Sequence, residues 1–398
     1  MKNIVRISYA GVILSYLIAN LKDVHFSTGI PLLINSVILF IYLFILSKRK
    51  RNVNRNIRII LIFIFILFLI YPLLTINYSF LNNILNEIFG MMVFTVNIFL
   101  TSKFIVEEDE ILKFLKITYL IMGIFLICMY IIHFDNFEGI KKLRYLFNNH
   151  LRYRYAFGFY YVNASGQICA LVLILNSILR KLERRKIKLY EIIFNIVSLI
   201  ILISSASRDS IITLILFYCM YYLISLKNKL ENRYRNKYIT AFINLLVVTI
   251  ILSVILVIIL LVSNNYINLD KIIQNTNRLG NFQNIQLLQY GNRRWIGIGL
   301  IDPGLFMSIG TYVDGWFLYM FLTESIFGIV VFLGLLTFLT KKLVINNDRS
   351  REGTIVASVF IISVFYSIFE TAFYNHNIIL SYIFWIIYLV YLRRKNYN

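Results

Sequence analysis

The stretch ILISSASRDSIITLIL, residues 201–216, holds one arginine and one aspartate between two strongly apolar runs. Each run belongs to a segment long enough to cross a bilayer as a helix. The connection between them is only a few residues long, so Arg208 must lie at the membrane edge, where a charge without a role is costly. The stretch therefore predicts a helical hairpin in a membrane, and the side on which its turn lies decides what Arg208 does.

Apolar runs of this kind recur along the whole chain. Of its 398 residues, 59% are hydrophobic, and the mean hydropathy is +0.75. A helix satisfies its own backbone hydrogen bonds in lipid, so each run is predicted to be helical. We expect an all-α, polytopic integral membrane protein with one membrane domain, 1–398, and about twelve transmembrane helices. The predicted spans are 4–20, 30–47, 57–74, 80–101, 111–132, 156–179, 187–204, 209–226, 239–263, 316–340, 354–373 and 376–392.

Lysine and arginine are distributed unequally between the two sides that these spans define. Of the 40 basic residues, 29 fall on the side that holds both termini, and 11 fall on the other side. Short loops rich in lysine and arginine stay in the cytoplasm, so we expect both termini to be cytoplasmic. The net charge of +21 is thereby explained by topology and predicts no nucleic-acid partner. Two long connections, 133–155 and 263–315, are predicted to be extracytoplasmic, and the second separates the ninth span from the tenth.

The basic residues predicted on the outer side are mostly arginines. A guanidinium group contacts two phosphate oxygens at once, which suits an anionic lipid headgroup. The alternative is that these residues pair with acidic side chains or touch lipid phosphates nonspecifically. Besides Lys22, the outer basic residues are Lys141, Lys142, Arg144, Arg152, Arg154, Arg208, Lys271, Arg278, Arg293 and Arg294.

Three stretches together resemble the Wzy-type polysaccharide polymerases and the related O-antigen ligases. The stretch RYRYAFGFYYVNASGQ (152–167) is similar to an Arg–Gly–Asn entry to a middle span, although Val162 stands where the family often has proline. The stretch SSASRDSII (204–212) is similar to the family's small-residue turn with an arginine. The third stretch, 277–328, matches an Arg, Gly-x-Gly, Asp, Gly series. The matching residues are Arg154, Gly158, Asn163, Arg208, Arg278, Gly297, Gly299, Asp314 and Gly328.

The resemblance implies a function in the bacterial cytoplasmic membrane. Such a protein takes oligosaccharide repeat units linked to undecaprenyl diphosphate and polymerises them by glycosyl transfer at the outer face, without a cofactor. A chain-length regulator and a flippase of the same pathway are the implied protein partners, alongside membrane lipids. Arginines already in place would stabilise the departing diphosphate. We expect Arg208 and Arg278 to hold it, with Arg154, Arg293 and Arg294 as further candidates.

The transfer also needs a base for the acceptor hydroxyl. His376 lies in the predicted outer connection before the last span, and histidine titrates near neutral pH. It is the first candidate, with Asp314 and Glu370 as rivals; Asp314 could instead cap the tenth helix. Asn163 and Gln167 are four residues apart on one helix face and could bind sugar hydroxyls or join helices.

The sequence is also compatible with two other functions. An O-antigen-ligase-like transferase differs only in the acceptor, and a flippase for lipid-linked oligosaccharide belongs to another class. A transporter is expected to show broken helices and charges at the midplane. The three cysteines lie in apolar segments without metal-binding spacing, so the sequence predicts no metal site.

Overall fold

The computed structural model of the chain describes residues 1–24, 26–46, 55–74, 81–133, 154–234, 297 and 315–395. Within these ranges every extended regular element is a helix, and one isolated antiparallel bridge joins Leu21 to Phe159. The predicted all-α class is confirmed for this part of the chain. Its elements are α1 (Lys2–Ala19), α2 (Gly29–Leu46), α3 (Arg55–Phe65), η1 (Ile66–Ile70), α4 (Tyr71–Leu74), α5 (Leu81–Glu107), α6 (Ile111–Ile132), α7 (Val162–Glu183), α8 (Leu189–Ser205), α9 (Arg208–Tyr234), α15 (Trp316–Thr340), η5 (Lys341–Ile345), α16 (Arg351–Phe369) and α17 (Ile379–Arg394).

Seven helices in the described residues are long and apolar enough to span a membrane. They cover Arg55–Leu73, Leu85–Glu107, Ile111–Ile132, Val162–Glu183, Arg208–Lys229, Thr323–Ile345 and Arg351–Ile368. Two shorter apolar helices, Gly29–Ile45 and Leu189–Ser205, also match predicted spans. The chain is therefore a membrane-spanning helical protein. The predicted ninth span, 239–263, and the long outer loops lie wholly or largely outside the described residues.

Several helix ends differ from the predicted spans: α7 begins at Val162 rather than at 156, α5 ends at Glu107 rather than at 101, and α16 ends at Phe369 rather than at 373. Helix α9 continues to Tyr234, eight residues past the predicted end of its span, because a helix can extend beyond the bilayer with polar residues. Helix α17 begins at Ile379 rather than at 376. Before it, residues 370–378 form a turn in which the Asn375 amide donates to the Ser381 hydroxyl at 3.0 Å.

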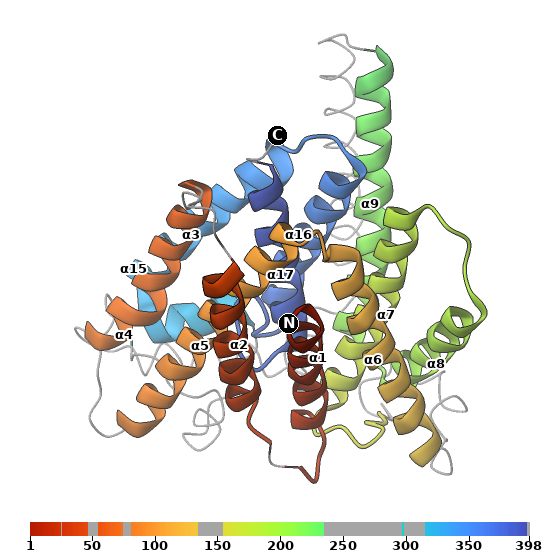
Figure 1. The fold of residues 1–398 in the computed structure, drawn as a ribbon, viewed down its shortest axis with the longest axis horizontal. Helices are drawn as coiled ribbons and strands as arrows, with labels where there is room; N and C mark the ends of the chain where they lie inside the picture. The colour runs from red at the N-terminus through yellow and green to blue at the C-terminus, as the bar shows by residue number, and fades with distance from the viewer. Residues whose placement is uncertain are drawn as a thin grey trace, which may run out of the picture.

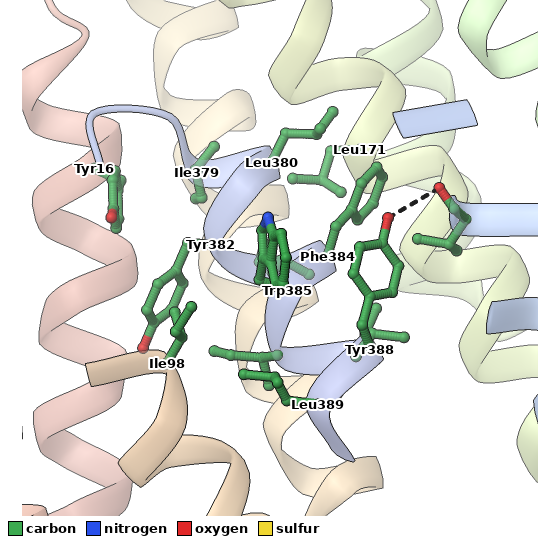
Figure 2. Packing of buried hydrophobic residues seen from close by; sticks show 14 of the residues in the cluster. Tyr16, Ile98, Leu171, Ile379, Leu380, Tyr382, Phe384, Trp385, Tyr388 and Leu389 are labelled. Carbon is green, nitrogen blue, oxygen red and sulfur yellow. Dashed lines mark hydrogen bonds between the residues drawn. The ribbon is translucent and has the colours of Figure 1, made fainter. Parts of the chain in front are cut away.

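The last helix, α17, forms the core of the described structure. All residues from 379 to 392 are buried, and the helix lies among α5, α16 and α7 (Figure 1). Its aromatic side chains point to several neighbours (Figure 2). The Trp385 indole donates to the Phe373 carbonyl at 2.6 Å, and the Tyr388 hydroxyl bonds to Ser363 at 2.7 Å. Buried rings of this kind supply apolar contact area while their polar atoms remain hydrogen-bonded.

An acidic turn, residues 107–110, joins α5 to α6. Glu110 in this turn is 3% exposed and accepts hydrogen bonds from Arg6 at 2.5 and 3.0 Å and from Lys113 at 3.0 Å. Burial alone would raise the pKa of Glu110, but these hydrogen bonds outweigh it and hold the pKa below its ordinary value. The glutamate therefore stays ionised and anchors the start of α1.

The same turn also holds both ends of the chain. Lys2 pairs with Glu108, and Arg394 pairs with Asp109. Arg394 also pairs with Glu352, in the first turn of α16, at 3.2 Å. These contacts gather at one end of the helix bundle.

At the opposite end, the connection after α1 meets the segment before α7. The Lys22 amide donates to the Gly158 carbonyl at 3.0 Å, and the Tyr160 amide donates to the Asn20 carbonyl at 2.8 Å. The Tyr155 amide donates to the Ser204 carbonyl at 3.2 Å, which adds the α8–α9 turn. Three connections that the charge distribution assigns to the outer side therefore lie together.

Candidate functional site

The turn between α8 and α9 is built from small residues. Ala206 has a positive φ of 49°, which lets the chain reverse between Ser205 and Arg208. Helix α7 packs against it at Gly166, where an added Cβ would lie 2.5 Å from the Ser207 Cβ. Only glycine permits this approach, so α7 and the turn are held at a fixed, short separation.

Arg154 connects this turn to the start of α7. Its Nε donates to the Ser205 carbonyl at 3.3 Å, and its guanidinium also donates to the Asn163 side-chain oxygen. Arg154 is exposed, and Asn163 is the second residue of α7. The two residues that resemble the family's Arg–Asn entry are therefore in direct contact.

Asn163 extends the contact to a third element. Its amide nitrogen donates to Glu370 Oε1 at 2.7 Å. Glu370 follows the last turn of α16 and has an extended backbone, with φ −134° and ψ 152°. Arg154, Asn163 and Glu370 form a hydrogen-bonded line, here called the outer triad. It joins the 154–161 segment, the start of α7 and the residue after α16, and α7 and α16 are in contact.

Arg208 belongs to the same end of the molecule. It is the first residue of α9 and is half-buried, three residues after the carbonyl that Arg154 contacts. The structure thus brings Arg154 and Asn163 into contact and places Arg208 three residues after the carbonyl that Arg154 contacts. Gln167 is half-buried on α7, one turn after Asn163.

His376 lies in the turn between α16 and α17, where the sequence placed it, but its imidazole faces α5. The ring Nδ1 lies 3.6 Å from Glu87 Oε1. Its Nε2 lies against Gly90, where an added Cβ would come within 2.7 Å of that nitrogen. The residue is 9% exposed, and its carbonyl accepts a hydrogen bond from the Tyr16 hydroxyl at 2.9 Å. His376 is thus packed against α5 and α1.

Helix α15 is broken at Ser325, within its first half. Ser325 has φ 54° and ψ −148°, and the Tyr71 hydroxyl donates to the Glu324 carbonyl at 2.6 Å. Glu324 is fully buried, and neither carboxylate oxygen has a hydrogen-bond partner among the described residues. Gly297 packs on this break, because a Cβ there would lie 2.3 Å from the Thr323 carbonyl oxygen.

An apolar cavity of about 540 Å³ opens between α3, η1 and α5. Its lining includes Thr95, whose hydroxyl lies 2.6 Å from that of Tyr374 in the turn before α17. The other lining residues are apolar: Leu61, Ile62, Ile64, Phe65, Ile66, Phe68, Leu69, Ile70, Met91, Met92 and Val96. Such a lining suits a hydrocarbon chain.

Comparison with protein-family models, curated proteins and solved structures found no match to this chain. Four predicted site residues lie outside them: Arg278, Arg293, Arg294 and Asp314.

The contact that sequence reasoning missed is the one between Asn163 and Glu370. The two residues are 207 positions apart, and the sequence carries no local signal for their pairing. The sequence predicts Glu370 as a rival base near the outer end of its span, but not as a partner of Asn163.

Proposed function

We propose that this protein is a bacterial membrane glycosyltransferase that polymerises oligosaccharide units linked to undecaprenyl diphosphate. The proposal includes twelve transmembrane helices with both termini in the cytoplasm, an arrangement that would put the outer triad at the extracytoplasmic face. The observation that carries the proposal is the convergence of Arg154, Asn163 and the Arg208 turn at the end of the bundle that the charge distribution assigns to that face.

The chemistry follows from the charges at this end. Breaking the glycosidic C–O bond leaves negative charge on the diphosphate, and guanidinium groups already in position stabilise that charge. Arg154 is exposed and held by Ser205 and Asn163, so little conformational freedom is lost when it binds phosphate. Arg208 supplies a second guanidinium from the adjacent turn.

The lipid part of the donor has a matching site. The cavity between α3, η1 and α5 has apolar walls, and its Thr95 contacts the turn that carries Glu370 and His376. A polyprenyl chain in this cavity would keep its diphosphate near the outer end of the bundle.

The orientation is tested by labelling single cysteines in a cysteine-free background of intact cells. Asp23→Cys, in an exposed outer connection, is expected to react with a membrane-impermeant maleimide. Lys186→Cys, in the exposed connection between α7 and α8, is expected to react only after permeabilisation. The reverse pattern would contradict the proposed topology.

The activity is tested by incubating the purified protein with a repeat unit linked to undecaprenyl diphosphate. The proposal predicts a ladder of longer glycans and release of undecaprenyl diphosphate. Transfer of a single glycan to a different acceptor would instead identify an O-antigen-ligase-like enzyme.

One observation favours a transporter as the second candidate. The break at Ser325 beside the buried Glu324 is the kind of interrupted helix that lines transport sites. Movement of the lipid-linked unit across the membrane of proteoliposomes, without formation of a glycosidic bond, would identify the protein as a flippase instead of a transferase.

A further inference from the structure

We propose that Glu324 binds a proton reversibly within the membrane-spanning part of the protein. Glu324 lies on α15 between two uncharged runs, 316–323 and 325–340, and is 0% exposed. Neither carboxyl oxygen has a hydrogen-bond partner among the described residues. An isolated carboxylate ion is very costly in such surroundings, so the side chain is stable there only as a neutral acid. This site does not depend on the reaction proposed above.

The other two buried glutamates in the described part of the chain have cationic partners. Glu110 is 3% exposed and accepts hydrogen bonds from Arg6. Glu191 is 0% exposed and pairs with Arg185. Where this fold buries an ionised carboxylate, it therefore supplies a guanidinium group to compensate the charge. No such group contacts Glu324 among the described residues, which indicates that its site is built for the neutral acid.

Packing alone does not account for a carboxyl at this position. A Cβ added at Gly328, one turn further along α15, would lie 2.6 Å from Glu324 Oε2, so the acid lies directly against its own helix. An apolar side chain would fill this space without leaving a buried polar group unpaired, which lowers stability. A membrane helix that keeps an ionisable residue in its interior usually does so for the chemistry of that residue.

The backbone beside the acid is interrupted. Ser325 has φ 54° and ψ −148°, and interrupted membrane helices are typical of sites that bind ions and protons. Tyr71 is the titratable residue that contacts this break, and its hydroxyl donates to the main-chain carbonyl of Glu324 at 2.6 Å rather than to the carboxyl. Within the described residues no charged group stabilises the ionised carboxyl.

Proton exchange at this site needs no further reactant than water. On release the O–H bond of the Glu324 carboxyl breaks, a water molecule at the break takes the proton as hydronium, and the electron pair stays on the carboxylate. On uptake both changes reverse. Because the carboxylate ion is costly without polar contacts, release requires that water enters the break.

The test uses the apolar reagent dicyclohexylcarbodiimide on purified protein in lipid vesicles, without a glycan donor or acceptor. A protonated carboxyl adds its O–H across one C=N bond of the carbodiimide, so the labelled peptide gains the mass of the whole reagent. We expect the adduct at Glu324 and not at Glu110 or Glu191, whose carboxylates are ionised. Labelling of Glu324 is expected to be lost as the pH is raised, because the carboxylate ion does not react.

Glu324→Gln is the matched variant, because glutamine has the size of the neutral acid and cannot ionise. We expect this variant to lose the adduct and to keep the thermal unfolding temperature of wild type. Glu110→Gln is the control for a glutamate that is buried in its ionised form, and it is expected to unfold at a lower temperature.

Three results would overturn the proposal. Absence of the adduct at Glu324, or equal labelling of Glu110, would show that Glu324 is not a neutral acid set apart from the ionised ones. Labelling that stays constant as the pH rises through the range in which the protein is folded would show that the proton does not exchange. A markedly lower unfolding temperature for Glu324→Gln would show that the fold needs the ionised form. None of these measurements involves a glycosidic bond, so their failure leaves the proposed function in place.

Discussion

Asn163 and Glu370 are joined by a hydrogen bond of 2.7 Å between the start of one membrane helix and the end of another. Arg154 completes the line from the other side of the amide. A side chain that bonds to a cation and to an anion at once fixes the geometry of both. The contact is therefore the structural centre of the proposed site.

Removal of this amide is expected to weaken the reaction. In Asn163→Ala, Arg154 and Glu370 lose their common partner, and hydrogen bonds to charged groups contribute about 1.5–3 kcal/mol each. We expect kcat to fall roughly 10- to 100-fold, measured as the rate of glycan extension. Asn176→Ala, further along the same helix, is expected to retain the wild-type rate. Equal losses in both variants would show that α7 tolerates neither change and would contradict a specific role for Asn163.

The close approach of α7 to the Ser205–Arg208 turn gives a prediction for Gly166. A Cβ in Gly166→Ala would meet Ser207 at 2.5 Å, so the turn must shift. Overpacking of this kind costs about 1–3 kcal/mol, and we expect a lower thermal unfolding temperature together with reduced activity. Gly11→Ala is the control, because nothing lies within 4 Å of a Cβ at that position. A Gly166→Ala protein as stable as wild type would contradict the tight contact.

A larger side chain in the apolar cavity is expected to weaken binding of donors with a long lipid but not of donors with a short lipid. Met92 lines the cavity and is 47% exposed, so Met92→Trp would occupy part of its volume. We expect a KM several-fold higher for the undecaprenyl donor and an unchanged KM for a donor with a short prenyl chain. Val37→Trp, on the exposed face of α2 outside the cavity, is expected to leave both values unchanged. A Met92→Trp variant with equal effects on both donors would place the lipid elsewhere.

The ionised Glu110 predicts how stability depends on pH. Its pKa is lower in the folded protein than in the unfolded chain, so its contribution is fully present above the unfolded pKa. The contribution is lost as the pH falls from the unfolded pKa through the folded one. Glu110→Gln is therefore expected to unfold at a lower temperature than wild type at pH 7, by the equivalent of about 1.5–3 kcal/mol. The difference should shrink when melting is measured below about pH 4; a constant difference would contradict the ionic role.

The helical class and most membrane segments follow from the sequence because apolar runs have the length of a bilayer and few other structures are stable in lipid. Hydropathy does not show which helix becomes the core. Helix α17 is buried over residues 379–392, although lipid-facing helices have similar composition. In lipid the outside of a bundle is as apolar as its inside, so buried and exposed helices look alike in sequence.

The candidate site was predictable only in part. Arg154, Asn163 and Arg208 carry local patterns, and the structure brings Arg154 into contact with Asn163 and with the Ser205 carbonyl of the turn before Arg208. The partner of Asn163 depends on how α7 packs against α16, which no local pattern reports. The orientation of His376 depends in the same way on Gly90, a residue on a different helix. The break at Ser325 likewise occurs in a helix without proline.

Removal of both guanidinium groups, in an Arg154→Ala Arg208→Ala variant, tests most directly whether the outer end of the bundle stabilises a departing diphosphate. The measurement is the initial rate of glycosidic bond formation at saturating lipid-linked donor, with purified protein. We expect a fall on the order of 10³-fold, because these donors act mainly on the charge that develops in the transition state. A double variant that forms the bond at the wild-type rate would contradict the assignment.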